Sequence, residues 1–318
     1  MKVIELLKKS KKTLFSFEIL PPLKGKDINL IYSTIEPLLE FKPPYVNITY
    51  HREEIVYKRH KSGLLEKKTV HKRPGTVAIS AAIKYQYKDI HVVPHIICGG
   101  FNKEETENAL IDLHFLGIRN LLVLRGDPVK SEQVFLPEED GHAHAIDLIK
   151  QITNLNQGLY LDEELGNTTA TDFSFGVAGY PEKHIEAPNM KFDLKYLKKK
   201  IDTGAEYIVT QMFFDNKKFF DFVKMCRKAG ITVPIVPGIK PISTIRQLNI
   251  LPQTFNIDIP EGLVKEIEKC KNNAQARQVG VEWAIIQSKE LVKFGVPVIH
   301  YYTMGKADNI QKIANAVF

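Results

Sequence analysis

Short apolar runs alternate along the whole chain with longer segments in which apolar residues recur at helical spacing. A continuous apolar run bounded by Gly or Pro is typical of a strand buried on both faces, as in a parallel sheet covered by helices. The pattern predicts strands at Thr13–Leu20, Tyr45–Tyr50, Ile90–Cys98, Ile118–Leu124, Phe173–Ala178, Tyr207–Phe214, Val233–Pro237 and Val296–Tyr302. It predicts helices at Asp27–Phe41, Pro74–Tyr85, Lys103–Leu116, His142–Asn154, Asn189–Thr203 and Asn216–Ala229, two or three more up to Lys293, and Asp308–Val317.

Eight strands that alternate with helices indicate an α/β fold, a (β/α)8 TIM barrel formed by residues 1–318 as a single domain. The alternative is a doubly wound open sheet, which would need a Gly-rich phosphate turn after the first strand, and PPLKGK (21–26) is no such turn. The basic stretch Lys58–Lys72 is interpreted as irregular and solvated. The segment 155–172 lacks apolar periodicity. We interpret it as an insertion at the amino-terminal side of the barrel, at a subunit contact.

Composition narrows the classes of function. The net charge of +7 permits an anionic ligand, but the 44 basic residues are interspersed with 37 acidic ones, and this pattern predicts no nucleic-acid partner. The three cysteines lie far apart without metal-ligand spacing, which argues against disulfides and structural zinc. The same cysteine pattern fits a reduced, cytoplasmic setting. The charged amino terminus and the lack of a long apolar run predict no signal sequence and no membrane segment.

Polar residues at the carboxyl ends of the strands are the candidates for chemistry, because active sites of barrels lie there. The run Leu121–Leu124 continues into Arg125, Gly126 and Asp127, although Arg125 and Asp127 could simply pair in solvent. Glu18 lies between two apolar residues, so desolvation should raise its pKa and make it a general acid near neutral pH. The alternative is a structural Glu18 paired with a cation. The amide of Gln211 suits a flat heterocycle.

Nucleophile and metal motifs are missing from the sequence. There is no GxSxG motif, and His91, His142 and His144 lack companion carboxylates at ligand spacing, so no metal site is predicted. Lys240 could act as a Schiff-base lysine in an aldolase-type barrel. Otherwise an acid, an isolated aspartate, amides and aromatic residues suit an enzyme whose cofactor supplies the chemistry.

Eight motifs then occur in chain order: FSFEILPP (15–22), VNITY (46–50), VVPHIIC (92–98), LLVLRGD (121–127), GVAGYPEKHIEA (176–187), DLKYLKKKIDTGAEYIVTQMFFD (193–215), IVPGIKPI (235–242) and IHYYT (299–303). Together they resemble the methylenetetrahydrofolate reductase family over essentially the whole chain. The resemblance implies a flavoprotein oxidoreductase that reduces 5,10-methylenetetrahydrofolate to 5-methyltetrahydrofolate by ping-pong hydride transfer from NADH or NADPH through bound FAD. It implies a role in one-carbon metabolism that supplies methionine synthesis, and a homo-oligomer. The alternative is a flavin-binding subunit of a larger electron-transfer complex.

The resemblance also assigns site residues. Glu18 matches the general acid that protonates the folate, and Asp127 matches a carboxylate that disfavours anionic reduced flavin and stabilises a cationic iminium. The positions that match cofactor-binding residues are Thr49, Tyr50, His95, Leu124, Arg125, Gly126, Asp127, His144, Ala145, Ala178, Tyr180, His184, Asp193, Lys199 and Lys200. The positions that match substrate-binding residues are Glu18, Gln211, Gln247, Tyr302 and Lys306. The chain departs from the family pattern at Lys306, commonly Arg, at His144, often aromatic, and at Leu251, in some members a Phe that contacts the nicotinamide nucleotide.

Overall fold

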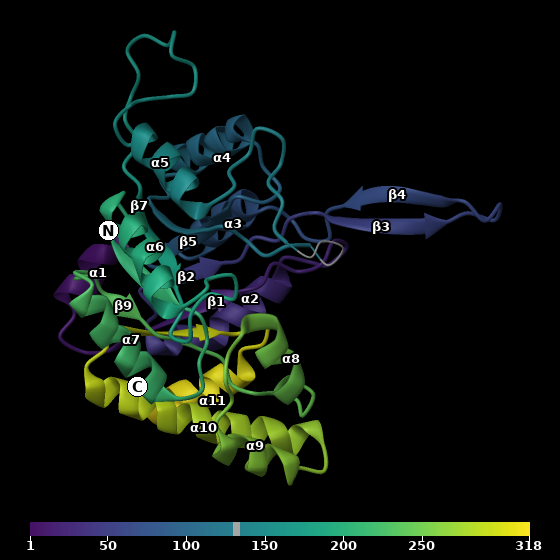
Figure 1. Ribbon diagram of the computed structural model, residues 1–318, viewed down its shortest axis with the longest axis vertical. Coiled ribbons are helices and arrows are strands. Elements are labelled where there is room, and N and C mark those ends of the chain that lie inside the picture. Colours follow the sequence, from purple (N-terminus) through teal and green to yellow (C-terminus); the bar gives the residue numbers. More distant parts are fainter. Residues whose placement is uncertain (130–133) are drawn as a thin grey trace.

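The strands of the barrel form one parallel sheet in the computed structural model, which describes residues 1–129 and 134–318. The strand order in this sheet is β10-β11-β1-β2-β5-β6-β7-β8-β9. The bounds are β1 (Leu14–Ile19), β2 (Tyr45–Ile48), β5 (His91–Ile97), β6 (Asn120–Leu124), β7 (Ser174–Gly179), β8 (Tyr207–Thr210), β9 (Ile235–Val236), β10 (Gly238–Ile239) and β11 (Val298–Tyr302). β9 and β10 are two pieces of one strand, separated by Pro237. The sheet therefore closes, and the predicted (β/α)8 barrel is confirmed (Figure 1).

Helices surround this barrel (Figure 1). They are α1 (Val3–Lys9), α2 (Asn29–Ile35), the 3₁₀ helix η1 (Glu36–Phe41), α3 (Thr76–Gln86), α4 (Lys103–Phe115), α5 (Ala145–Leu155), α6 (Met190–Asp202), α7 (Asn216–Lys228), α8 (Gln247–Phe255), α9 (Glu261–Glu268), α10 (Asn273–Phe294) and α11 (Asp308–Val317). The helix predicted over Asp27–Phe41 is divided at Glu36, where Pro37 lacks the N–H that a continuous α-helix would use. The strand predicted to reach Phe214 ends at Thr210.

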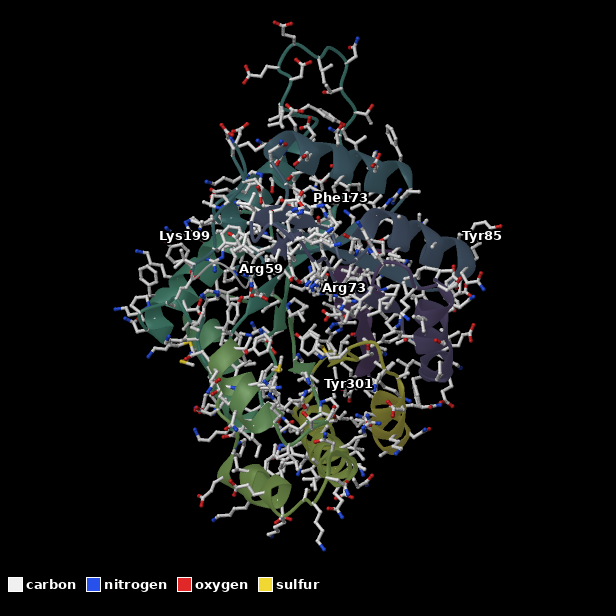
Figure 2. All side chains as sticks on the ribbon, turned by 90° about the vertical axis from the view of Figure 1, so that its right-hand side faces the viewer. Arg59, Arg73, Tyr85, Phe173, Lys199 and Tyr301 are labelled. Carbon is white, nitrogen blue, oxygen red and sulfur yellow. The ribbon has the colours of Figure 1, made fainter. Side chains whose placement is uncertain are left out.

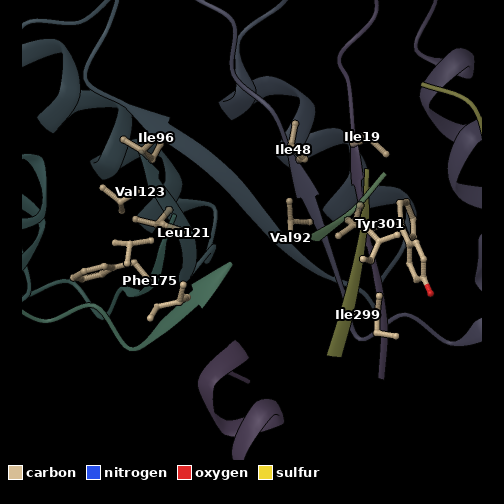
Figure 3. Packing of buried hydrophobic residues seen from close by; sticks show 14 of the residues in the cluster. Ile19, Ile48, Val92, Ile96, Leu121, Val123, Phe175, Ile299 and Tyr301 are labelled. Carbon is tan, nitrogen blue, oxygen red and sulfur yellow. The ribbon is translucent and has the colours of Figure 1, made fainter. Parts of the chain in front are cut away.

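Alternating residues of the strands form two apolar layers. Outward-facing side chains such as Val92, Ile96 and Leu121 belong to the larger cluster, between the strands and the helices (Figure 3). Inward-facing side chains such as Val93 and Leu122 form a smaller cluster within the barrel. The strands are buried on both faces, which explains their nearly continuous apolar sequences.

Helix α1, which the sequence pattern did not predict, packs against the inner layer. Val3 and Leu7 belong to the inner cluster, and the backbone N–H of Val3 donates to Asn120 Oδ1 at 2.8 Å. The helix has only seven residues, too few to show a clear helical period. Because α1 packs into this end, the open space of the barrel lies at the carboxyl ends of the strands.

Two segments project from the barrel, a β-hairpin and the loop that follows α5 (Figure 1). The interpretation of Lys58–Lys72 as irregular is wrong, because β3 (Glu54–Arg59) and β4 (Leu65–Val70) form an antiparallel hairpin. Its signals were the β-branched and aromatic residues Ile55, Val56 and Tyr57 and a Gly in the turn, Gly63, with a φ of +87°. The segment 155–172 has no regular helix or strand past Leu155, and its role at a subunit contact stays a prediction. No helix of the described residues is long and apolar enough to cross a bilayer.

Candidate active site

A cavity of about 660 Å³ lies at the carboxyl ends of the strands. Most residues that the sequence pointed to line it. These are Glu18, Thr49, Tyr50, His95, Leu124, Arg125, Gly126, Asp127, His144, Ala145, Ala178, Tyr180, His184, Asp193, Lys200, Gln211 and Tyr302. Residues from separate strands and loops therefore converge on one space, of the size that small-molecule and cofactor sites have.

Three residues that the resemblance assigns to the site lie outside this lining. Lys199 is exposed on α6, at the periphery of the molecule in Figure 2, with Nζ 5.1 Å from the Tyr196 ring centroid. Gln247 begins α8, and its Oε1 accepts the backbone N–H groups of Ser243 and Thr244 at 2.7 and 3.2 Å. Lys306 is exposed beyond β11. Contacts of these three side chains with a ligand stay predictions.

The inner wall of the barrel is polar on one side and mostly apolar on the other. Strands β11, β1, β2 and β5 contribute polar inward-facing side chains, namely His300, Tyr302, Ser16, Glu18, Tyr45, Asn47 and His95. Strands β6, β7 and β8 contribute Leu122, Leu124, Ala178 and Val209 to the cavity. This division separates a wall that can handle protons from a wall on which a flat ring can lie.

The central polar contact joins Glu18 and His95. Glu18 Oε2 lies 3.3 Å from His95 Nε2, and both side chains are largely buried. Burial raises the pKa of Glu18 to about 8. Burial, reinforced by the nearby His300 and His51, lowers the pKa of His95 to about 3. At pH 7 both groups are therefore neutral, and the Glu18 carboxyl O–H donates to the imidazole.

Asn47 also contacts the His95 ring. Its Nδ2 lies 3.3 Å from His95 Nε2, so the Asn47 amide and the Glu18 carboxyl approach the same ring nitrogen. Register pairing places Glu18 beside Asn47 on β2 and beside Tyr302 on β11. Thr303 Oγ1 also donates to the Glu18 carbonyl at 2.6 Å, which fixes the strand that carries the acid. The proton on Glu18 is thus held in place by its neighbours.

Arg125 does not pair with Asp127 in solvent. Its guanidinium is bound in a bidentate manner by Glu186, with Nη1–Oε2 and Nη2–Oε1 distances of 2.5 and 2.7 Å, and lies 5.0 Å from the Phe135 ring centroid. Gly126 has a φ of +89°, and a Cβ there would lie 3.0 Å from Ile97 Cδ1. The turn after β6 therefore needs glycine, and it leaves the Asp127 side chain exposed on the cavity wall.

A second group of polar residues follows β7. The Tyr180 and His184 rings meet edge to face at 4.8 Å, and Asp193 Oδ2 accepts the His184 N–H at 2.8 Å. Lys200 Nζ donates to the Ala178 carbonyl at 3.0 Å, and burial lowers the pKa of Lys200 to about 8. These side chains surround the apolar wall with hydrogen-bonding groups and a cation.

Tyr302 depends on a glycine opposite it. Its hydroxyl donates to the Thr210 carbonyl at 2.6 Å, across the gap beside Gly238 of β10. A Cβ at Gly238 would lie 2.3 Å from that carbonyl oxygen and 2.4 Å from the Tyr302 hydroxyl. Only a residue without a side chain lets this tyrosine reach its acceptor.

Sequence reasoning missed further lining residues, namely His51, Arg52, Glu54, Glu186, Phe192, Tyr196, Phe255 and Met304. They lie beyond the strand ends, in loops, helices or the hairpin, where strand periodicity carries no signal. Leu251 is buried away from the cavity, but Phe255, one helical turn later on α8, lines it. An aromatic side chain thus reaches the cavity from the helix that carries Leu251.

The alternative chemistries find little support in the described residues. Lys240 is buried and its pKa is lowered to about 8 by desolvation, but it does not line the cavity that holds the other residues. No group of three His, Cys, Asp or Glu side chains among residues 1–129 and 134–318 could hold a metal ion.

Comparison with known proteins decides the family. The family model described as methylenetetrahydrofolate reductase matches residues 2–317 of this chain. The chain belongs to the methylenetetrahydrofolate reductase family. It is 32% identical over 317 residues to a probable methylenetetrahydrofolate reductase (NADPH) of Caenorhabditis elegans, covering 99% of this chain and 43% of that protein. It is 31% identical over 296 residues to a 5,10-methylenetetrahydrofolate reductase of Pectobacterium carotovorum, covering 92% of this chain and 86% of that protein.

The extent of these matches differs between the groups of relatives. The chain spans about half the length of the eukaryotic relatives, 43% of the Caenorhabditis protein and 50% of the Arabidopsis thaliana methylenetetrahydrofolate reductase (NADH) 1. Among solved structures, an uncharacterized Clostridium thermocellum protein that binds two copies of 5-methyl-5,6,7,8-tetrahydrofolic acid has a TM-score of 0.59 at 16% identity, covering 98% of this chain and 97% of that one. This structural likeness supports the barrel fold.

Proposed function

We propose that this protein reduces 5,10-methylenetetrahydrofolate to 5-methyltetrahydrofolate, with bound FAD and with NADH or NADPH as the hydride source. The observation that carries the proposal is the buried, neutral Glu18–His95 pair on the wall of the cavity, in a chain of this family. When bound, FAD relays a hydride from the nicotinamide nucleotide to the one-carbon unit of the folate. The product would supply methionine synthesis in the cytoplasm.

The residues of the cavity fit a flavin nucleotide. The apolar wall of Leu124 and Ala178 offers a face for the ring system, and Gly126 lets the backbone approach it closely. Lys200 supplies positive charge toward the pyrophosphate, and Arg125, whose guanidinium is held by Glu186, lines the same cavity. The remaining residues that would hold FAD are Thr49, Tyr50, His95, Asp127, His144, Ala145, Tyr180, His184 and Asp193, with Lys199 reaching in from the surface of α6.

Glu18 then supplies the proton of the reaction. Its neutral carboxyl donates a proton to a nitrogen of the five-membered folate ring, and the bond between that nitrogen and the one-carbon unit breaks to leave an iminium cation. The hydride adds to this cation, and Glu18 regains a proton from solvent. Gln211, Tyr302, Gln247 and Lys306 are proposed to orient the folate.

Asp127 has a different role from Glu18. Its carboxylate is exposed on the cavity wall and Arg125 is held by Glu186 instead, so its negative charge is not neutralised by that neighbour. A fixed anion stabilises a cationic iminium electrostatically, without moving a proton. We therefore assign proton transfer to Glu18 and charge stabilisation to Asp127.

The rate of folate reduction should fall as pH rises through about 8, because Glu18 has a pKa of about 8 and must carry its proton to act as an acid. Below pH 8 the protonated form of Glu18 dominates, and its titration does not reduce the rate of folate reduction. The measurement is the pH profile of single-turnover folate oxidation of the reduced enzyme. A rate that stays constant from pH 6 to pH 10 would contradict the assignment of Glu18.

The visible absorbance spectrum of the purified protein tests the proposal as a whole. We expect a yellow protein that is bleached by NADH or NADPH without oxygen, and whose colour returns when methylenetetrahydrofolate is added. A yellow protein that neither nucleotide bleaches would instead indicate a flavin-binding subunit of a larger electron-transfer complex. A protein that binds no flavin would refute the proposal.

A further inference from the structure

The β3–β4 hairpin projects from the barrel as a two-stranded sheet, and no other strand of residues 1–129 and 134–318 pairs with either of its edges (Figure 1). Such isolated hairpins are marginally stable in water, and open edges and faces are sites of association. The hairpin follows β2 directly, and its first residue Glu54 lines the cavity. Its outer part is free to contact another molecule.

The two faces of this hairpin differ in charge. Cross-strand pairs place Ile55 beside Thr69, Tyr57 beside Lys67 and Arg59 beside Leu65 on one face, which we call the Tyr57 face. Tyr57 and Leu65 are 62% and 65% exposed. Within the described residues Arg59 and Lys67 form no salt bridge, and the Tyr57 face carries no acidic side chain. Figure 2 views the molecule from the side toward which the hairpin projects, and it labels Arg59.

The opposite face is electrically balanced. It carries Glu54, Lys58, Glu66 and Lys68 with two valines. Glu66 accepts from Lys68 at 3.4 Å and Glu54 from Lys72 at 2.5 Å. The opposite face thus balances its two lysines with two glutamates, whereas the Tyr57 face carries cations and exposed apolar side chains without an acid. This indicates a partner that is both apolar and acidic.

The chain itself carries a segment of that chemistry. Residues 159–165, which we call the acidic loop, read LYLDEEL. Leu159 and Leu165 are 56% and 51% exposed. Asp162, Glu163 and Glu164 form no salt bridge within the described residues. The loop extends beyond α5 in one direction and the hairpin extends from the barrel in another, so the two do not meet within one molecule (Figure 1).

We propose that the Tyr57 face of the hairpin binds the acidic loop of a second copy of this chain. Tyr57 and Leu65 would cover Leu159 and Leu165, and Arg59 and Lys67 would face Asp162, Glu163 and Glu164. In a closed pair with two-fold symmetry each copy supplies one hairpin and one loop, so the contact forms twice. The contact uses no residue of the proposed proton transfer and is independent of the proposed function.

Charge reversal on either side tests the contact by sedimentation equilibrium. We expect the wild type to associate to twice its chain mass of 36.2 kDa. The hairpin variant Arg59→Glu/Lys67→Glu and the loop variant Asp162→Lys/Glu163→Lys/Glu164→Lys should each weaken association tenfold or more, because like charges then face each other. The control Lys289→Glu/Lys293→Glu makes the same change in net charge as the hairpin variant on the exposed surface of α10 and should associate as the wild type does.

Mixing the two variants gives the decisive result. The hairpin variant then offers an acidic hairpin to a basic loop, and the loop variant offers a basic hairpin to an acidic loop, so the mixture should associate although neither variant does alone. A wild type that is monomeric, including one whose hairpin binds an oligonucleotide instead, overturns the proposal. It is also overturned if the variants associate normally, or if they dissociate and mixing restores nothing.

Discussion

Replacing Glu18 with Gln should slow folate reduction by about 10²- to 10⁴-fold, the usual contribution of a positioned general acid. Gln keeps the size of the side chain and can donate to His95, but it cannot release a proton to the folate nitrogen. Flavin binding and bleaching by NADH should stay near the wild-type level, because those steps need no proton from this residue. Stopped-flow absorbance measures the two half-reactions separately.

Glu107→Gln is the matched control for this variant. Glu107 is also buried with a raised pKa, caused mainly by desolvation, but it accepts the Leu161 N–H at 2.9 Å outside the cavity lining. The Glu107→Gln substitution should leave the rates of both half-reactions unchanged. Wild-type folate reduction in Glu18→Gln would show that Glu18 is structural, and equal loss in both half-reactions would assign it to cofactor binding.

Replacing Gly238 with Ala should destabilise the barrel by about 1–3 kcal/mol, the usual cost of inserting a methyl group into a packed site. The new Cβ would lie 2.3 Å from the Thr210 carbonyl oxygen and 2.4 Å from the Tyr302 hydroxyl, so the strand or the tyrosine must move. Displacing Tyr302 breaks its hydrogen bond to Thr210 and should raise the KM for the folate. Urea unfolding and steady-state kinetics measure the two effects.

Gly262→Ala provides the comparison within the same chain. Gly262 lies in α9, and a Cβ there would meet only the Trp283 ring at 3.9 Å, an ordinary contact. Gly262 is the second residue of α9, so alanine there should stabilise the protein by no more than the ~0.5–1 kcal/mol gained in a helix interior and should leave kinetics unchanged. If Gly238→Ala matched Gly262→Ala in stability and KM, Tyr302 would have no positional role.

Much of the barrel was readable from local patterns, because burial on both faces leaves a nearly continuous apolar run wherever a strand lies. The bounds of α11 and the carboxyl ends of β6 and β11 agree with the sequence prediction. The hairpin was not predicted because both of its faces carry charged residues, so neither strand shows an apolar alternation. Helix α1 was not predicted from the sequence, because packing into the end of the barrel stabilises it and a helix of seven residues is not stable by itself.

The sequence by itself determined that Glu18 is an acid among apolar neighbours, and that RGD follows a buried strand, since both are properties of adjacent residues. Only the tertiary structure decided which groups meet. His95 on β5 accepts a hydrogen bond from Glu18 on β1. Arg125 pairs with Glu186, in the segment after β7, and not with Asp127. The physical reason is that pKa values and ion pairing depend on burial and distance in space. Burial and distance are set when the folded barrel brings distant segments together, and the order of residues along the chain does not determine them.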